Sequence, residues 1–151
     1  MSFKLSQRSL RNLEGVDSRL VEVVHIAIQL TRIDFGVIEG VRTVARQREL
    51  VASGASQTMA SKHIEGKAVD LAAFIGPRLS WELSLYDDIA DAMKIGAIEV
   101  GVPVRWGGAW NVPDIRAWDG TMQDAMTFYV DARRSQGRRP FLDGPHFELM
   151  V

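Results

Sequence analysis

The residues best suited to chemistry are two of the chain's three histidines. His63 lies in a small polar segment, and His146 follows a proline in the run Asp-Gly-Pro-His-Phe-Glu. His25 lies between apolar neighbours in a helical pattern, which favours a packing or surface role. The sequence contains no cysteine, which excludes disulfides, thiolate nucleophiles and Cys-based metal sites. Any bound metal must therefore be held by His, Asp or Glu.

Asp70 is a carboxylate inside the apolar run 68–74, where we expect it to be partly or wholly buried. Burying an unpaired charge costs on the order of several kcal/mol, so this carboxylate needs a partner from elsewhere in the fold. One explanation is an ion pair with a distant arginine such as Arg42. The other is that Asp70 binds a metal ion.

The spacing of His63 and Asp70 limits how both could bind one ion. On one continuous helix they would be separated by about 10 Å of rise, and on an extended chain by more than about 20 Å. Gly66 lies between them and would let the loop fold back toward the strand. With His146, two imidazoles and one carboxylate would leave a fourth position open, as in catalytic zinc sites.

Apolar periodicity predicts the elements that must position these side chains. Helical spacing predicts helices over 6–13, 18–30, 44–51 after a Thr43 cap, 80–100 with Ser80 as the cap, and 121–135. Short apolar runs predict strands over 34–39, 68–74, 102–106 and 146–151, with loops over 55–62, 107–120 and 133–139. The pattern indicates an α+β fold in which a small sheet is packed by helices.

Length and charge narrow the function classes. At 151 residues we expect one catalytic domain, 1–151, and a monomer. The net charge of -1 gives no reason to expect nucleic acid as a partner. The exception is a basic cluster, Arg133, Arg134, Arg138 and Arg139. Because it lacks interleaved aromatic residues, we expect it to form a solvated loop or to help the protein approach an anionic cell wall. No run is long enough to span a membrane, so we expect no stable insertion.

Four motifs together carry a family resemblance. Residues 61–70 fit the pattern Ser-x-His-x-x-Gly-x-Ala-x-Asp, and residues 143–148 read Asp-Gly-Pro-His-Phe-Glu. Residues 40–43 read Gly-Val-Arg-Thr, and residues 105–110 read Arg-Trp-Gly-Gly-Ala-Trp. In this order they resemble the D-alanyl-D-alanine metallopeptidase superfamily, which includes vancomycin-resistance dipeptidases, carboxypeptidases and phage L-alanyl-D-glutamate endolysins. The resemblance implies a small, mostly antiparallel sheet with a zinc site at its face, as in Hedgehog-like and D-Ala-D-Ala peptidase-like folds.

The resemblance also implies roles for single residues. Zn²⁺ would be held by His63, Asp70 and His146. Asp143 would be the general base that takes a proton from water at the metal and passes it to the leaving amine. Arg42 would stabilise the oxyanion or hold a substrate carboxylate.

Other positions are assigned less narrowly. Ser61 would bind substrate or orient its loop, and Trp110 would wall the pocket or simply pack. Glu148 is either a partner of His146 or a rim acid, and Glu65 is expected to be a solvated loop charge. Family members often carry an acid at the position of Ala109, so a polar contact in the substrate pocket is in doubt.

Within the superfamily, the endolysin branch is favoured. An Asp three residues before the last His, and an N-terminus like that of single-domain phage enzymes, both resemble that branch. The N-terminus lacks the apolar core of a signal peptide, so we expect the enzyme to wait in the host cytoplasm until lysis and then act on periplasmic peptidoglycan. The expected substrate is the peptidoglycan stem peptide, cut between L-Ala and D-Glu.

Two alternatives stay open. The first is a D-Ala-D-Ala dipeptidase or carboxypeptidase of the same superfamily, because substrate choice depends on loop shape. The second is a zinc-containing binding domain without activity. The presence of both Asp143 and Arg42 argues against the second.

Overall fold

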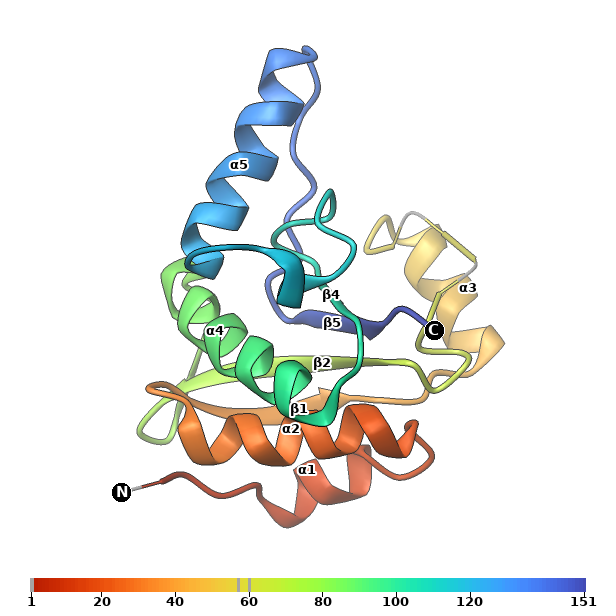
Figure 1. Cartoon of the computed structure of the whole chain (residues 1–151). Coiled ribbons are helices and arrows are strands. Elements are labelled where there is room, and N and C mark those ends of the chain that lie inside the picture. The colour runs from red at the N-terminus through yellow and green to blue at the C-terminus, as the bar shows by residue number, and fades with distance from the viewer. Residues whose placement is uncertain (1, 57, 60) are drawn as a thin grey trace.

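The computed structural model describes residues 2–56, 58–59 and 61–151. Within this part of the chain, one five-stranded sheet has neighbours in the order β1-β2-β5-β4, with β3 paired to β2, and every pairing is antiparallel (Figure 1). Its strands are β1 (Asp34–Glu39), β2 (Ala68–Ile75), β3 (Arg78–Ser80), β4 (Val104–Trp106) and β5 (His146–Leu149). The α+β class and the small antiparallel sheet expected from the sequence are confirmed.

Helices pack around this sheet. They are α1 (Gln7–Asn12), α2 (Ser18–Leu30), α3 (Val44–Ala52), α4 (Leu83–Val100) and α5 (Met122–Ser135), with a short 3-10 helix, η1 (Ile115–Ala117). The predicted helix 18–30 is confirmed at both ends. Thr43 caps α3 as predicted, because its side chain accepts from the backbone N–H of Arg46. Thr121, predicted as the first residue of a helix, instead caps α5 by accepting from the backbone N–H of Asp124.

The core lies between the sheet and the packed pair α2 and α4. Alternate residues of β2, namely Val69, Leu71 and Ala73, are fully buried in this core. At Gly96 of α4 an added Cβ would come within 2.7 Å of the Val23 carbonyl of α2, so the two helices approach closely. Because side chains alternate along a strand, Asp70 points to the opposite face of the sheet, away from these helices.

The helix predicted over 80–100 begins later than expected. Residues 78–80 instead form β3, which pairs with the end of β2, and α4 starts at Leu83. Ser80 is therefore a strand residue and does not cap the helix; the N-cap is Glu82, without a side-chain cap bond. Ser80 is held in the strand from two sides, because its backbone pairs with Ala73 and its carbonyl accepts from the Tyr86 hydroxyl at 2.8 Å.

Two strand boundaries also differ from the prediction, because ladder partners set where a strand begins and ends. The strand predicted over 102–106 starts at Val104, and the one predicted over 146–151 ends at Leu149. The loop predicted over 107–120 contains η1, and the basic loop predicted over 133–139 begins inside α5. The loop predicted over 55–62 includes positions 57 and 60, which lie outside the described residues.

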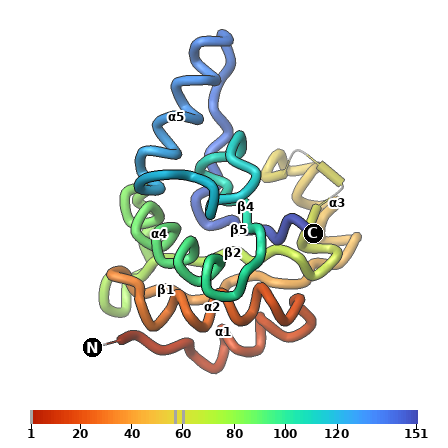
Figure 2. Tube along the Cα trace, in the orientation of Figure 1, coloured from red at the N-terminus to blue at the C-terminus, as the bar shows by residue number. Residues whose placement is uncertain are grey.

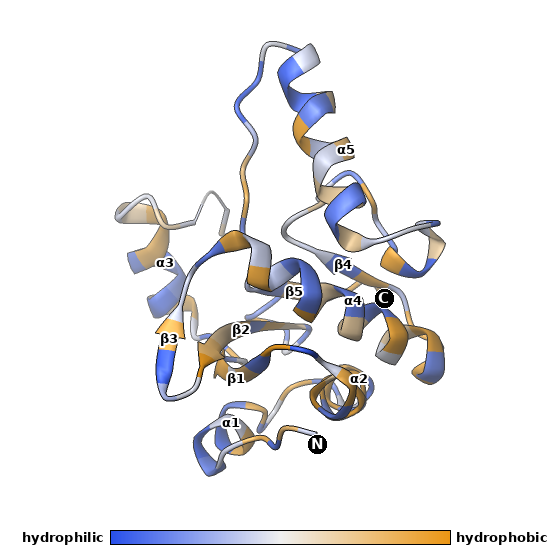
Figure 3. Ribbon diagram, turned by 90° about the vertical axis from the view of Figure 1, so that its left-hand side faces the viewer, coloured by the Kyte–Doolittle hydropathy of each residue, from blue (hydrophilic) through white to orange (hydrophobic). Residues whose placement is uncertain are grey.

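Helix α5 and the segment that follows it form an arm that projects from the body of the molecule (Figures 1 and 2). The arm is held together by the Tyr129 hydroxyl, which accepts from the Phe141 backbone N–H at 3.1 Å. Its far end is hydrophilic (Figure 3). None of the helices in the described part of the chain combines the length and apolar character that crossing a bilayer requires.

Candidate metal centre and active site

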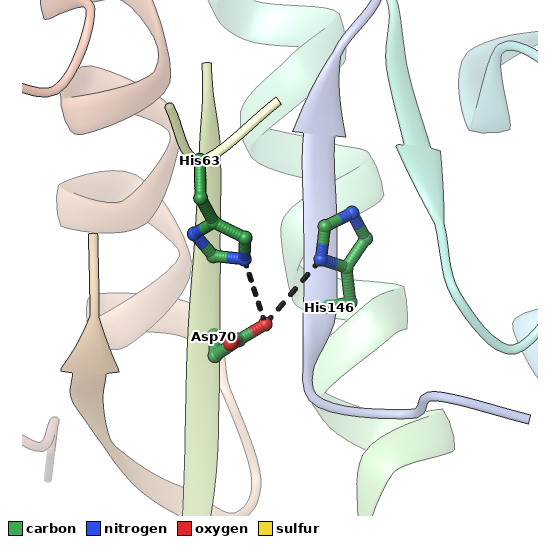
Figure 4. A group of neighbouring side chains, drawn as sticks. All are labelled: His63, Asp70 and His146. Atoms are coloured by element: carbon green, nitrogen blue, oxygen red, sulfur yellow. Dashed lines mark ion pairs between the residues drawn. The ribbon is translucent and has the colours of Figure 1, made fainter. Parts of the chain in front are cut away.

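Asp70 and His146 are cross-strand neighbours. The register of β2 and β5 places their Cα atoms opposite each other, on the face of the sheet turned away from the α2–α4 core. His146 Nδ1 lies 3.4 Å from Asp70 Oδ1 (Figure 4). Two residues far apart in sequence thus meet because antiparallel pairing aligns them.

His63 reaches the same carboxylate oxygen from the loop before β2. Its Nε2 lies 3.3 Å from Asp70 Oδ1. Gly66 turns the loop with a φ of +71°, and an added Cβ there would come within 2.7 Å of the Gly15 carbonyl. The turn expected at Gly66 is therefore present, and only glycine fits it without strain.

These three side chains form a group that could hold a metal ion. One ligand atom from each of His63, Asp70 and His146 lies within 4.8 Å of the others. Among the residues that the structure describes, His63 Nε2 and Asp70 Oδ1 are buried and have no hydrogen-bond partner. Buried polar atoms are normally satisfied, so two such atoms facing a common point fit a bound cation. The donor set, imidazole nitrogen and carboxylate oxygen, suits zinc.

The outer nitrogen of each imidazole is held by an acceptor. His63 Nδ1 lies 2.8 Å from the Gly40 carbonyl, and His146 Nε2 lies 2.8 Å from Glu148 Oε1. Such bonds place the ring proton on the outer nitrogen and leave the inner nitrogen as a lone-pair donor. Burial opposes ionisation of Asp70, but the nearby imidazoles of His146 and His63 outweigh burial and hold the pKa of Asp70 well below its usual range. The carboxylate is thus ionised and ready to bind a cation.

Asp143 lies beside this group on the loop that enters β5. Its backbone N–H donates to the Gly107 carbonyl at 2.9 Å, and its carbonyl accepts from His146 N–H at 3.0 Å. An added Cβ at Gly107 would collide with the Asp143 carbonyl, which explains the glycine. Burial, and then the charge of Asp70, raise the pKa of Asp143 above its usual value. A half-buried carboxylate with a raised pKa is suited to accept a proton.

Arg42 is fixed by several acceptors. Its guanidinium donates to both oxygens of Glu39, at 2.7 and 2.9 Å, and to Gln47 Oε1 at 2.6 Å. It also lies 3.4 Å from Asp70 Oδ2. The two explanations considered for Asp70 therefore coexist, because Arg42 faces one oxygen and the imidazoles face the other. Sequence reasoning missed Glu39 and Gln47; a fully buried glutamine on a short helix can be identified only once the packing is known.

Ser61 and Trp110 both lie at the site. The Ser61 hydroxyl accepts from the His63 backbone N–H at 3.2 Å and from Arg42 Nη1 at 3.4 Å. It therefore links the loop to the arginine. The Trp110 ring centroid lies 5.3 Å from that of His146 and 6.3 Å from that of Phe141. Trp110 thus forms an aromatic wall beside the histidine.

Glu148 is buried, with 4% of its surface exposed, so it is a partner of His146 and no rim acid. Its second oxygen lies 3.1 Å from Arg105 Nη2, and the Arg105 guanidinium in turn lies 5.0 Å from the Trp110 ring. A chain of contacts therefore runs from the aromatic wall through Arg105 and Glu148 to the histidine.

The site opens into a cleft of about 910 Å³. The cleft is lined by the three residues of the metal group, by Arg42, Ser61, Trp110 and Asp143, and by the inner side of α5. The seven residues expected from the sequence to hold the metal, act in catalysis or bind substrate thus meet at one cleft.

The remaining candidates lie elsewhere. His25 is exposed on α2, and Glu65 is exposed in its loop, as expected. Ala109 is fully buried in the core and does not line the cleft.

A small antiparallel α+β fold with a His–Asp–His group that could hold a metal ion, a neighbouring carboxylate and an open cleft is an arrangement typical of metal-dependent hydrolases. Comparison with known proteins identifies the family. Residues 1–150 match the model of the phage L-alanyl-D-glutamate peptidase family, and the chain belongs to this family.

Two further comparisons give named relatives. The chain is 34% identical to the L-alanyl-D-glutamate peptidase of Escherichia phage T5, over 99% of this chain and all of that protein. A crystal structure of the Serratia marcescens L-Ala D-Glu endopeptidase ChiX covers 97% of this chain and matches over 90% of its own length, with a TM-score of 0.72 and 36% identity. A shorter match, 34% identical over half of this chain, is to the L-alanyl-D-glutamate peptidase of Listeria phage A118.

Proposed function

We propose that this protein is a zinc-dependent endopeptidase that hydrolyses the L-Ala–D-Glu bond of peptidoglycan stem peptides during host lysis by a phage. The observation that carries the proposal is the meeting of His63, Asp70 and His146 beside Asp143, in a chain that belongs to the phage L-alanyl-D-glutamate peptidase family. The L-Ala–D-Glu bond is the one that the phage T5 peptidase and the Serratia marcescens endopeptidase are named for.

Zinc would be held by His63 Nε2, His146 Nδ1 and the Asp70 carboxylate, the atoms that already face one another. When bound, the ion would supply Lewis-acid polarisation of the scissile carbonyl and acidify a water molecule. Gly40 and Glu148 would keep the two imidazoles in the tautomers that binding needs.

Asp143 would move the proton. Its raised pKa suits it to take a proton from the attacking water and later to protonate the leaving nitrogen of D-Glu. Its backbone bonds to Gly107 and His146 hold it beside the metal group, which keeps this transfer short.

Arg42 would donate to the oxygen that gains charge when water adds to the carbonyl. Its contacts with Glu39 and Gln47 hold the guanidinium rigid, so little reorganisation would accompany the reaction. Ser61 would support this arginine and the His63 loop, and Trp110 would cover the peptide from the side of His146.

We further propose that the enzyme stays in the host cytoplasm until lysis and then acts on periplasmic peptidoglycan as a monomer. Its partner would be the stem peptide, with no role for nucleic acid. This rests on its family of phage peptidases and on the peptide-sized cleft.

The decisive experiment is digestion of purified Gram-negative peptidoglycan, with mass spectrometry of the released fragments. Wild type, chelator-treated enzyme and Asp143→Ala would be compared, with Asp131→Ala on the exposed side of α5 as the matched control. We expect new amino-terminal D-Glu from wild type and the control alone. For Asp143→Ala we expect a loss of about 10²- to 10⁴-fold in rate.

Other outcomes separate the alternatives. Release of free D-Ala would indicate a D-Ala-D-Ala peptidase. Folded, zinc-loaded protein that leaves peptidoglycan intact would indicate a binding domain.

A further inference from the structure

The cleft contains equal numbers of acidic and basic side chains, but they are not equally paired. The acids are Glu39, Asp70, Asp143 and Glu148, and the bases are Arg42, Lys62, Arg105 and Arg133. Two of the bases already face carboxylates: Arg42 contacts Glu39 and Asp70, and Arg105 contacts Glu148. Carboxylates of the protein therefore offset much of the positive charge of these two arginines.

Lys62 is different. Among the described residues, its ammonium group has no hydrogen-bond or ion-pair partner, although the side chain is half-buried and lines the cleft. Burial raises the pKa of Glu148, but the hydrogen bond with His146 lowers it, and the charges of Arg105 and Lys62 add to this lowering. Both oxygens of Glu148 are already engaged, one by His146 and the other by Arg105. Within the described part of the chain, the Lys62 ammonium is thus left to bind an anion that enters the cleft.

Its position places that anion next to the reaction. Lys62 directly precedes His63, and the backbone carbonyl of Lys62 accepts from Glu65 and Lys67 at 3.2 and 2.9 Å. This tight turn fixes the backbone of Lys62 beside the metal group. Arg133, the other base without a carboxylate, lies on α5 and donates to the Arg139 carbonyl.

The proposed substrate has an anion at the matching place. In a stem peptide, D-Glu continues the chain through its γ-carboxyl group, so its α-carboxylate stays free. That carboxylate is one carbon from the scissile nitrogen and must enter a cleft that four acids line. A cation that no carboxylate already pairs would stabilise it most, because opposite charges attract strongly in a partly buried site.

We propose that Lys62 binds the free α-carboxylate of the D-Glu residue and so selects stem peptides in which this group is not amidated. This inference rests on the proposed function. A charge-assisted hydrogen bond at a half-buried site corresponds to roughly tenfold in kcat/KM. Amidation of the same group would remove the charge while leaving the scissile bond unchanged.

The test combines two substrates with four proteins. The substrates are L-Ala-D-Glu-containing stem tetrapeptides that differ only in a carboxylate or a carboxamide on the D-Glu α-carbon. The proteins are wild type, Lys62→Gln, Lys62→Arg and, as a charge-matched control, Lys4→Gln on the exposed N-terminal segment. The readout is kcat/KM for each substrate, measured by mass spectrometry.

We expect wild type, Lys62→Arg and Lys4→Gln to prefer the carboxylate by roughly tenfold. Lys62→Gln should lose this preference while cutting the carboxamide within about twofold of the wild-type rate. A merely structural role would slow both substrates equally in Lys62→Gln, and that result would overturn the proposal.

Three further outcomes would also overturn the inference. Equal cleavage of both substrates by wild type would contradict this inference but not the proposed function. With Arg133→Gln added as a fifth protein, loss of the preference in that variant but not in Lys62→Gln would move the subsite to α5. Cleavage of neither substrate by wild type would contradict the proposed function itself, and the inference with it.

Discussion

Glu148 Oε1 lies 2.8 Å from His146 Nε2, on the side of the imidazole that faces away from Asp70. The two residues are separated by one position in β5, so their side chains share a face of the sheet. Arg105, directly opposite Glu148 on β4, holds the other carboxylate oxygen at 3.1 Å. The candidate metal ligand is therefore oriented by a carboxylate that is itself oriented by a cation.

Replacing Glu148 should weaken metal binding. In Glu148→Gln the orienting acceptor loses its charge, and we expect zinc affinity to fall by about 10- to 100-fold. Competition with a chromophoric chelator measures this affinity directly. Glu99→Gln, an exposed position on α4, is the matched control and should bind zinc like wild type. Equal affinities for wild type and Glu148→Gln would refute the orienting role.

Metal should stabilise the fold through His63. At a free zinc concentration about 100 times the dissociation constant, binding to the folded state alone adds about 2.7 kcal/mol, or about 5–10 °C in Tm for a chain of this size. Chelator should remove this increment, and His63→Ala should show none. The measurement is differential scanning calorimetry with and without zinc. A His63→Ala protein that still gains the full increment would exclude this histidine as a ligand.

Gly66 should be intolerant of a side chain. Gly66→Ala places a Cβ in a left-handed conformation and within 2.7 Å of the Gly15 carbonyl. The conformation alone costs about 1–2 kcal/mol, and the contact would displace the loop that carries His63. We expect lower stability in urea and weaker zinc binding.

Gly76→Ala is the control for Gly66→Ala, because it adds a Cβ at a positive φ without a close contact. Gly76 also has a positive φ, +60°, but an added Cβ there meets no atom within 4 Å. It should lose stability without losing zinc affinity. If both variants bind zinc like wild type, the loop does not depend on the turn at Gly66.

Asp87 should make stability depend on pH. This α4 carboxylate is 7% exposed, and its Oδ1 has no hydrogen-bond partner among the described residues. Burial, together with the charges of Asp88 and Asp91, raises its pKa from 3.8 to about 6. The folded state therefore holds the proton more tightly than the unfolded state. The resulting stability is fully present below about pH 4 and is lost as pH rises through about 6.

Asp87→Asn should remove this dependence. At pH 7.5 we expect it to raise the free energy of unfolding by up to about 3 kcal/mol, with little change at pH 4. Urea unfolding across this range measures the effect. Asp131→Asn, at an exposed position on α5, should leave the pH profile unchanged. An Asp87→Asn protein less stable than wild type at pH 7.5 would show that the carboxylate has a stabilising partner.

Much of the site could be predicted from residue types and local pattern. An acid inside an apolar strand and a glycine between it and a histidine indicated a metal group, and the family resemblance completed that group and added Asp143. The helices 18–30 and 44–51 were predicted well because their apolar periodicity and caps are local. The start of α4 was not, since β3 exists only through its pairing with β2.

Residue types and their pattern establish which groups are available for chemistry: three histidines, no cysteine, and an aspartate in an apolar strand that needs a partner. Which atoms meet follows from the folded chain, because it depends on strand register and on loop closure over long separations. Register places His146 opposite Asp70 and Arg105 opposite Glu148. Packing buries Gln47 against Arg42 and leaves the Lys62 ammonium without a partner among the described residues. Such pairings join residues whose local sequences carry no sign of each other, so only the folded chain reveals them.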